Sequence, residues 1–359
     1  MKICILANFV FPHCGGSENV LKNVADILVR DYNYEISVYG FSCKVPFSKN
    51  CVKYFPCPRG NALISEISKF DHTLIYSDSF WEYGTVVKNI EKVSHIVSVC
   101  LVGGYHMQSH PEIFNLLKKN IDKFNLITHS KMTPDYKWCI DNGLPVKVIP
   151  NGVNLNFFRE NKISFREKYD IKSKHIILNV SSFFFGKGFE LLPKIARKIE
   201  SKDFIIIQCS NSVQYPYDKV FLERTKQQSK GLPIRFLRDL PREDIIAAFQ
   251  QSDVFLQVSK KEVAPLVILE SRSAKLPYVS MDVGNTKENP GGIIINNSKE
   301  DHKGYKVVDS KVINHFAVAI EHLLNMPRMR QAAIDEGQQD IEKIDWDNIV
   351  KLYNEVFSK

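Results

Sequence analysis

The sequence predicts an α/β protein built from two Rossmann-like, doubly wound domains that face each other across a cleft. The chain has 359 residues, which is too many for one compact core and enough for two. Short apolar runs alternate with helical patterns through the first half, and the second half repeats this alternation. Buried runs separated by crossover helices are typical of parallel sheets covered on both faces. We therefore expect two parallel sheets.

The first predicted domain covers residues 1–150. Its expected strands are short and rich in Val, Ile and Leu, as in a sheet that is buried on both faces. These strands lie at residues 2–7, 35–39, 73–76, 95–100, 125–128 and 146–149, with helices at residues 17–29 and 111–121. Ligands of open α/β sheets bind outside the carboxyl ends of the strands, so the loops that follow the strands are the candidate site positions.

The second predicted domain covers residues 151–342 and joins the first near Pro150-Asn151-Gly152-Val153. It shows the same alternation of buried runs and helical patterns. Its expected strands lie at residues 175–180, 204–208, 234–237, 254–258 and 278–281, with helices at residues 190–199, 242–251 and 265–274. No fixed-period repeat, low-complexity tract or Pro-rich linker is present, so we expect two similar folds rather than a repeat array.

Composition and charge favour an ordinary globular protein of the cytoplasm. Hydrophobic residues make up 44% of the chain and charged residues 25%, which excludes disordered and collagen-like proteins. No apolar run reaches the roughly 18 to 20 residues that span a bilayer. The eight cysteines form neither CxxC pairs nor zinc-ligand patterns. Cys51 and Cys57 are a redox pair or, in the simpler reading, reduced packing residues. The net charge of +8 suits polyphosphates, anionic lipid or nucleic acid without distinguishing them.

The first candidate site feature is the Gly15-Gly16 pair, where the first strand turns into the first helix. Two glycines let the backbone approach a ligand, and the N–H groups and dipole of the helix suit a phosphate. A Gly-Gly turn is more often a plain turn than a binding site. The pattern is neither GxGxxG nor a Walker loop, which argues against a dinucleotide dehydrogenase or a P-loop ATPase.

A second candidate feature is the pair Glu262 and Glu270, which follows the strand at residues 254–258. Pro265 is well placed as the first residue of a helix, so we expect Glu262 on the preceding loop and Glu270 within the early turns. A carboxylate that accepts two hydrogen bonds suits a vicinal diol, and a helix N-terminus can hold a diphosphate. From the spacing alone, a solvated loop charge at Glu262 and an exposed helix residue at Glu270 are the favoured explanation of the two glutamates.

The surroundings of this pair decide between the two interpretations, since the chain resembles the family-4 retaining glycosyltransferases of the GT-B fold. Their hallmark is a Glu, seven residues and a second Glu, as at Glu262 and Glu270. Further matching segments occur in the same order as in that family: the amino-terminal loop at 15–18, the interdomain hinge at 148–153, the basic donor loop at 180–188, the segments 234–245 and 249–259 before the hallmark, and a final helix at 343–359, which contains Trp346 and in that family returns to the first domain.

The resemblance implies a role for each matching residue. Glu270 would bind the nucleotide ribose, Glu262 the hydroxyls of the donor sugar, and Lys187 the departing diphosphate. Residues Val263, Ala264, Pro265 and Leu266 form the segment whose backbone N–H groups would meet sugar and phosphate, and Gly15 and Gly16 would close over the phosphates. Such enzymes need neither a metal nor another cofactor, because cationic side chains and helix dipoles stabilise the leaving group. The nucleotide-diphosphate sugar is itself a co-substrate.

Three departures from the family pattern mark where this chain differs. Ser182 in the donor loop stands where these enzymes usually carry an Arg, and Lys260, Lys261 and Arg272 are the nearby cations. Residues 208–211 replace a glycine-rich loop. Val263 and Pro265 replace glycines after the first Glu.

His106 and the three phenylalanines at 183–185 each allow a functional and a structural interpretation. His106, in the sequence Gly-Gly-Tyr-His at 103–106, resembles a histidine that contacts the transferred sugar, and a hydrogen-bonded structural histidine is the alternative. The three phenylalanines at 183–185 are interpreted as packing rather than as a platform that stacks a base.

Together these features predict a retaining, metal-independent glycosyltransferase that moves a sugar from a nucleotide-diphosphate donor to a hydroxyl of a glycan or glycolipid. Peripheral contact with an anionic membrane at its cytoplasmic face would suit the positive charge. Two alternatives remain: a glycosyltransferase that acts on modified, hydroxymethylated DNA bases, and a non-catalytic GT-B protein that binds a nucleotide sugar. Nucleic acid is permitted as a partner but not favoured, because the chain has no block of Lys and Arg.

Overall fold

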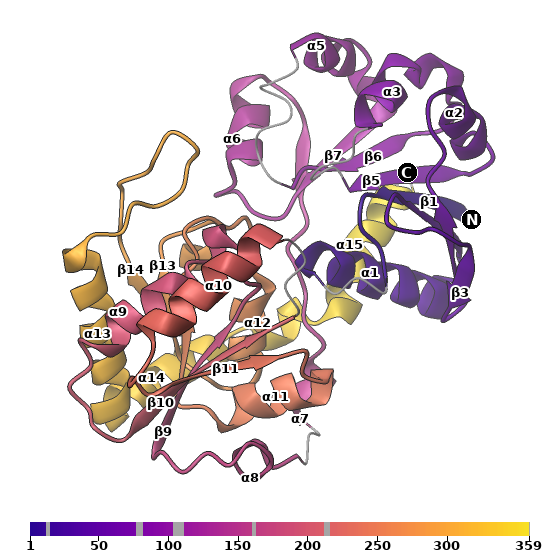
Figure 1. Cartoon of the computed structure of the whole chain (residues 1–359). Helices are drawn as coiled ribbons and strands as arrows, with labels where there is room; N and C mark the ends of the chain where they lie inside the picture. The colour runs from indigo at the N-terminus through magenta and orange to yellow at the C-terminus, as the bar shows by residue number, and fades with distance from the viewer. Residues whose placement is uncertain (12–14, 77–81, 103–110, 160–162, 212–215, 359) are drawn as a thin grey trace. The chain divides into compact units, whose positions relative to one another are not determined.

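The computed structural model describes residues 1–11, 15–76, 82–102, 111–159, 163–211 and 216–358. The chain forms two compact units. Unit 1 consists of Met1–Gly152 together with Ile344–Lys359, and unit 2 of Val153–Lys343. Each unit is an α/β layer structure around a mainly parallel sheet, as the sequence predicts (Figure 1).

Among its described residues, unit 1 has an eight-stranded sheet in the order β3-β4-β2-β1-β5-β6-β7-β8. The strands are β1 (Lys2–Ala7), β2 (Glu35–Gly40), β3 (Phe47–Lys49), β4 (Val52–Pro56), β5 (His72–Tyr76), β6 (Val97–Cys100), β7 (Phe124–Thr128) and β8 (Val146–Val148). The helices are α1 (Gly16–Tyr32), α2 (Asn61–Ile67), α3 (Tyr83–Lys88), α5 (Pro111–Lys119), α6 (Pro134–Asp141) and α15 (Trp346–Phe357). The strand order reverses direction between β1 and β5, which makes the sheet doubly wound.

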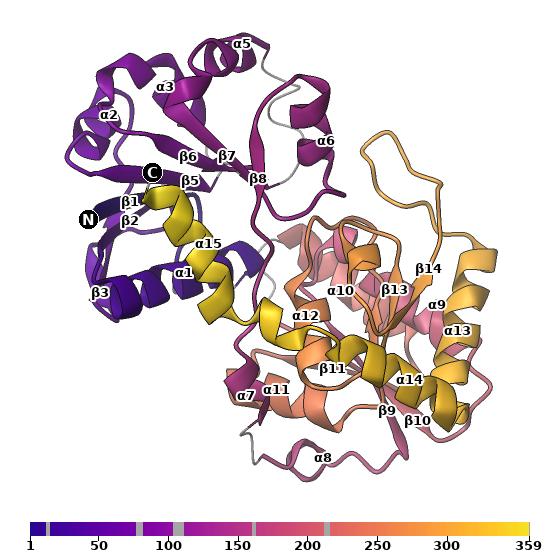
Figure 2. The same ribbon diagram turned by 180° about the vertical axis from the view of Figure 1, so that it is seen from behind.

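The last helix of the chain, α15, is part of unit 1 and lies beside α1 (Figures 1 and 2). Its buried side includes Trp346, Val350 and Tyr353. A methyl group on Gly152 would lie 2.6 Å from the Trp346 ring, so the backbone at the end of the first segment packs directly on the indole. This packing, reinforced by an ion pair of 2.8 Å between Lys147 and Glu355, holds the chain terminus on unit 1.

Among its described residues, unit 2 has a six-stranded sheet in the order β11-β10-β9-β12-β13-β14. The strands are β9 (His175–Val180), β10 (Phe204–Ser210), β11 (Ile234–Arg238), β12 (Val254–Gln257), β13 (Tyr278–Met281) and β14 (Gly292–Ile295). The helices are α7 (Leu155–Arg159), α8 (Phe165–Lys168), α9 (Leu192–Ala196), α10 (Pro216–Gln228), α11 (Arg242–Gln251), α12 (Leu266–Ser273), α13 (Ser310–Asn325) and α14 (Pro327–Gln338). Figure 2 shows the long loop that joins β14 to α13.

The structure differs from the expected elements in several places. The strands β3, β4 and β14 were not predicted, because polar residues interrupt the apolar pattern in β3 and β4 and β14 begins at a glycine. Asn50 and Cys51 both have positive φ, which suits the tight turn between β3 and β4. Pro265 is not the first residue of α12: its extended backbone (ψ 118) makes it the N-cap, and the helix begins at Leu266.

The expected helix at 190–199 is shorter in the structure. A single 3-10 turn at Phe189–Leu191 precedes α9, which ends at Ala196. Cys51 and Cys57, the candidate redox pair, are both free thiols. No helix within the described residues is both long enough and apolar enough to cross a lipid bilayer.

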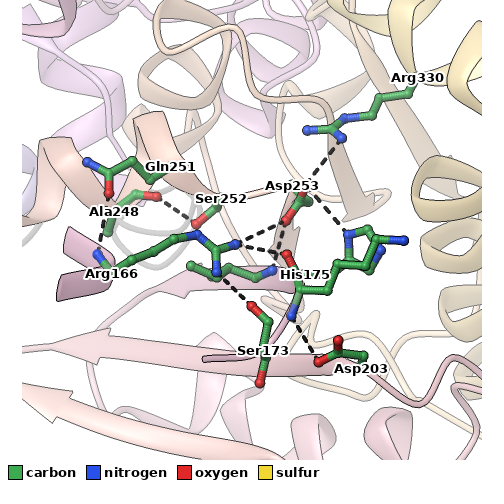
Figure 3. A network of polar contacts seen from close by, with 11 residues as sticks. Arg166, Ser173, His175, Asp203, Ala248, Gln251, Ser252, Asp253 and Arg330 are labelled. Carbon is green, nitrogen blue, oxygen red and sulfur yellow. Dashed lines mark hydrogen bonds and ion pairs between the residues drawn. The ribbon is translucent and has the colours of Figure 1, made fainter. Parts of the chain in front are cut away.

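A polar network ties the amino ends of β9 and β12 together (Figure 3). The Asp253 carboxylate accepts a hydrogen bond from the Ile176 backbone N–H at 2.9 Å and lies 3.2 Å from the Arg330 guanidinium on α14. Arg166 on α8 approaches the same carboxylate at 3.8 Å and donates to the Ser173 carbonyl. Because ligands of doubly wound sheets bind at the opposite, carboxyl ends of the strands, we assign this network to stability rather than to function.

His72, at the start of β5, makes the stability of unit 1 depend on pH. The ring is buried, and its Nε2 lies 2.8 Å from Ser98 Oγ. Burial, with a smaller contribution from His95, lowers the pKa of His72 from 6.5 to about 4. Well above pH 6.5 the imidazole is neutral in both the folded and the unfolded chain. Its full contribution to the free energy of unfolding is then present. As the pH falls from 6.5 towards 4, the unfolded chain binds a proton that the folded chain does not, and stability is lost.

We therefore expect unit 1 to lose about 2 kcal/mol of unfolding free energy through His72 between pH 6.5 and 5, since one pKa unit corresponds to about 1.4 kcal/mol. The measurement is urea unfolding at pH 7.5, 6.5 and 5 for the wild type and for His72→Gln. The glutamine variant should show a smaller loss over the same range, while other buried histidines contribute equally to both proteins. Equal pH slopes in the two proteins would contradict the assignment.

Candidate active site

The candidate site lies in unit 2, where the strand order reverses. From β9 the chain proceeds outward to β10 and β11, and then returns to the other side of β9 with β12. The carboxyl ends of β9 and β12 therefore flank the topological switch point, where ligands of doubly wound sheets bind. The loop after β9 carries Lys187, and the loop after β12 carries Glu262, so the fold brings these two predicted site residues to one place.

Lys187 ends a single 3-10 turn, Phe185–Lys187, whose backbone is fixed against the end of β12. Gly188 has a positive φ of 70°, and a Cβ there would lie 2.0 Å from the Val258 carbonyl oxygen. The backbone N–H of Lys260 donates to the Gly186 carbonyl at 2.8 Å. Only glycine fits at position 188, and this close approach sets the position of the lysine.

Lys187 and Glu262 form an ion pair, with 2.7 Å between Nζ and Oε1. The side chain of Glu262 is only 12% exposed and that of Lys187 is 32% exposed, so the pair is partly shielded from water. A cation held beside a carboxylate at a strand-end loop can meet a phosphate and a sugar hydroxyl side by side. The structure thus brings the two predicted site residues into direct contact.

The segment 262–265 is held in place by the loop after β13. The Asn285 backbone N–H donates to the Val263 carbonyl at 3.0 Å. Gly284 has a φ of 55°, and a Cβ there would lie 2.4 Å from the same carbonyl oxygen and 3.0 Å from the Glu262 carbonyl carbon. Backbone therefore packs on backbone at this point, and the shape of the predicted sugar pocket depends on a residue outside the motif.

We expect Gly284→Ala to displace the Glu262 loop. The added methyl group collides with the Val263 carbonyl, and alanine is strained at positive φ, so a cost of roughly 1–3 kcal/mol is expected. Thermal unfolding should show the destabilisation, and donor turnover should fall by more than the folded fraction accounts for. Gly231→Ala is the matched control, because Gly231 also has a positive φ (75°) but no atom within 4 Å of its Cβ position. Equal turnover in the two variants would contradict the expectation.

Glu270 lies on α12, the helix that follows the switch-point strand β12, and its side chain is buried. Its Oε1 accepts a hydrogen bond from Arg242 Nη2 at 2.5 Å, and Arg242 is the first residue of α11. No sequence motif marks Arg242, because it stands at a polar helix start beside Glu243 and Asp244. The available signal was a cation shortly after β11, whose carboxyl end lies at the same edge of the parallel sheet as that of β12.

The nearby cations that could replace the missing arginine at Ser182 have structural partners. Lys260 is buried, with its Nζ 2.7 Å from Glu190 Oε1 and 3.1 Å from the centre of the Phe185 ring. Arg272 is buried and donates to the carbonyls of Gly337 and Gln339. Lys261 Nζ donates to the Lys303 carbonyl at 3.1 Å.

The aromatic residues of the donor loop pack mainly against protein. Phe183 belongs to the hydrophobic core of unit 2, and Phe185 contacts Phe221 and Tyr305. Phe184 is exposed. Residues 208–211 stand where the resembled family has a glycine-rich loop. Of these, Gln208 is buried in β10 and donates through Nε2 to the Ser181 carbonyl. The packing interpretation is therefore confirmed for Phe183, whereas Phe184 is exposed and Phe185 is partly exposed beside its aromatic neighbours.

In unit 1, Gly15 is the N-cap of α1 and Gly16 its first residue. A Cβ on Gly15 would lie 2.2 Å from Glu18 Oε2, so the carboxylate folds back onto the first turn. A phosphate at this turn would have to displace that carboxylate. His106 lies outside the described residues. Within the described part of the chain, no group of three or more His, Cys, Asp or Glu side chains is arranged to hold a metal ion.

The fold and this site define a glycosyltransferase of the GT-B fold. Residues 161–340 match the family described as Glycosyl transferases group 1, and the chain belongs to that family. The match covers the whole set of site residues in unit 2 described above.

Curated relatives are distant. The sulfoquinovosyl transferase SQD2 of Arabidopsis thaliana is 22% identical over 85% of this chain and 62% of its own length. The GPI3 subunit of the phosphatidylinositol N-acetylglucosaminyltransferase of Saccharomyces cerevisiae is 21% identical over 67% of this chain and 49% of its own length. The chain thus spans less than two thirds of the length of these relatives.

Solved structures share the fold over the whole chain. HepE of Anabaena, in complex with UDP-glucose, superposes with a TM-score of 0.77 at 16% identity and covers 100% of this chain and 99% of its own. Sucrose-phosphate synthase of Thermosynechococcus elongatus gives a TM-score of 0.77 at 13% identity, with 99% of each chain covered. At these identities the likeness is one of fold.

Proposed function

We propose that this glycosyltransferase moves a sugar from a nucleotide-diphosphate donor to a hydroxyl of a glycan or glycolipid acceptor, as a family-4-like retaining enzyme that needs no bound metal. The observation that carries the proposal is the Lys187–Glu262 ion pair at the switch point between β9 and β12. Glu270, separated from Glu262 by seven residues, lies buried on the helix that follows.

The donor half of the proposal follows from the chemistry of these groups. The Lys187 ammonium would leave Glu262 in part to neutralise the diphosphate, while Glu262 accepts hydrogen bonds from hydroxyls of the transferred sugar. Glu270 would hold the ribose, and the backbone from Val263 to Leu266, at the start of α12, would face sugar and phosphate. Ser182 provides a hydroxyl instead of a second cation. HepE, which has the same fold, was solved with UDP-glucose, which supports a UDP sugar as the first donor to test.

The proposed mechanism retains the anomeric configuration of the donor sugar without a protein nucleophile. The bond between the anomeric carbon and the phosphate oxygen breaks, and the acceptor oxygen attacks the same face of the sugar. The departing phosphate oxygen takes the proton of the acceptor hydroxyl. Lys187 stabilises the negative charge that develops on the diphosphate, which is the part that a metal ion would otherwise play. Gly15, Gly16 and His106 of unit 1 are proposed to complete the site around phosphates and sugar.

The proposed acceptor class is suggested by the acceptors for which two relatives are named. The GPI3 subunit belongs to an enzyme named for phosphatidylinositol, and a D-inositol 3-phosphate glycosyltransferase of Corynebacterium urealyticum is 25% identical over 34% of this chain. An acceptor with an inositol or a lipid-linked hydroxyl is therefore the first class to test. A lipid-linked acceptor would bring the enzyme to a membrane surface, where its net charge of +8 favours anionic lipid.

The test is nucleotide release from UDP-glucose, UDP-N-acetylglucosamine, GDP-mannose and ADP-glucose, with and without phosphatidylinositol vesicles, in parallel buffers that contain either EDTA or a divalent metal ion. We expect release from at least one donor and a product whose anomeric configuration, read by NMR, equals that of the donor. Glu262→Ala should abolish transfer while nucleotide affinity is largely retained. No release from any donor would refute the proposed activity; an inverted product or loss of activity in EDTA would refute retention or metal independence.

A further inference from the structure

The arginine at the start of α11 lies against the carboxylate proposed to bind ribose. Arg242 Nη2 and Glu270 Oε1 are 2.5 Å apart. The Glu270 side chain is 11% exposed and the Arg242 side chain 46% exposed, so the guanidinium reaches from solvent onto a largely buried carboxylate. The two residues come from different helices, α11 and α12, and are 28 positions apart in the chain.

The turn before α11 directs Arg242 to this position. Asp239, after β11, has a φ of 54°, and its backbone N–H donates to the Ser210 carbonyl at the end of β10. Pro241 is the extended N-cap of α11, with φ −52° and ψ 149°. The kink at Asp239 and the fixed φ of the proline leave little freedom for the first helical residue.

Comparison with Arg272, on the same helix as Glu270, shows that the Arg242 contact differs from a structural one. Arg272 is buried, and its guanidinium donates to the Gly337 and Gln339 carbonyls and to Asn289 Oδ1. Arg242 is half exposed, and the hydrogen bond that the described residues give it is the one to Glu270. A guanidinium with five donors and one protein acceptor is not needed to fill the core.

We propose that Arg242 is a positioning residue for the nucleoside half of the donor: it fixes the plane of the Glu270 carboxylate so that the free oxygen accepts from the ribose hydroxyls. The inference rests on the proposed function and deepens it. An ionised carboxylate has lone pairs on both oxygens, and a charge-assisted hydrogen bond to one of them leaves the other aligned for a diol. The enzyme should then discriminate ribonucleotides from 2′-deoxyribonucleotides, because a site built to bind a hydroxyl disfavours ligands that lack it.

The test compares UDP with 2′-deoxy-UDP by isothermal titration calorimetry, with the guanosine and adenosine pairs run in parallel. We expect the wild type to bind the ribonucleotide about 10–100-fold more tightly than its deoxy analogue, the range that a hydrogen bond to a charged group supports. Arg242→Gln should weaken ribonucleotide binding about tenfold and change deoxynucleotide binding by less than about twofold, while Arg242→Lys recovers part of the difference.

Two controls keep the result specific. Arg238→Gln removes an exposed arginine on β11 and should leave both ligands unchanged. Lys187→Ala should weaken both ligands by the same factor, because its proposed partner is the diphosphate. Unfolding curves check that each variant is folded.

Two kinds of result would contradict the proposed role of Arg242. Equal weakening of both ligands in Arg242→Gln, or a wild type that does not distinguish them, would overturn the role of Arg242 while the proposed transfer activity stands. A wild type that binds none of the three ribonucleotides would instead remove the proposed function, and this inference with it.

Discussion

Lys187→Ala is expected to lower donor turnover by a factor of about 10²–10³, the range seen when one preorganised group that stabilises transition-state charge is removed. The ammonium lies on a turn that Gly188 locks against β12, so its position is set before the donor arrives. Such a group does not have to reorganise when charge develops on the leaving diphosphate. Its removal also leaves the Glu262 carboxylate without its 2.7 Å partner.

The measurement is kcat for nucleotide release or transfer with whichever donor the nucleotide-release panel identifies. Lys187→Arg keeps the charge and should retain more activity than the alanine variant. Lys194→Ala, which removes an exposed lysine on α9 of the same unit, is the matched control and should behave as the wild type. A kcat within about threefold of wild type for Lys187→Ala would exclude a direct role on the diphosphate.

Lys260→Met is expected to destabilise unit 2 by about 3–5 kcal/mol, the usual cost of breaking a buried ion pair from one side. The Lys260 side chain is 7% exposed, and its partner Glu190 is 16% exposed. Within the described residues, Glu190 Oε2 is buried without a hydrogen-bond partner, so loss of the lysine would leave the carboxylate with no compensation. The lysine also stacks on Phe185, two residues before Lys187.

Calorimetry should show the unit 2 transition about 10 °C lower, since 1 kcal/mol corresponds to roughly 2–4 °C for a unit of this size. The double variant Lys260→Met/Glu190→Leu should recover much of the loss, because no buried charge then remains unpaired. Lys261→Met, at the adjacent and less buried position, should shift the transition far less. Equal melting of the single and double variants would show that the pair is not energetically coupled.

Much of the fold could be predicted because the strands of a parallel sheet are buried on both faces. In β1, β9 and β10 the apolar runs are continuous, and the structure places strands there. The short strands β3, β4 and β14 were not predictable in this way. Polar residues interrupt the apolar pattern in β3 and β4, and β14 begins at a glycine, so none of the three has a local pattern that marks a strand.

Some residues of the candidate site could be predicted from the sequence, and others could not. Glu262, Glu270 and Lys187 could be selected from motif and order, and the structure brings Lys187 and Glu262 together across 75 positions of sequence. Arg242 and the partner of Lys260 could not be selected. A cation in a polar segment has no sequence pattern that distinguishes a solvated side chain from one paired with a buried carboxylate on another helix.

The amino-acid sequence by itself determined the double α/β alternation, the positions of most strands and the residue types available at the strand ends, because hydrophobic periodicity and turn residues are local properties of the chain. The tertiary structure alone decided which of those residues meet. Strand order brings β9 beside β12, close backbone approach at Gly188 and Gly284 sets the two loops, and burial pairs Lys260 with Glu190 and Glu270 with Arg242. These contacts join segments far apart in sequence, and only packing of the whole unit selects among the pairings that charge alone permits.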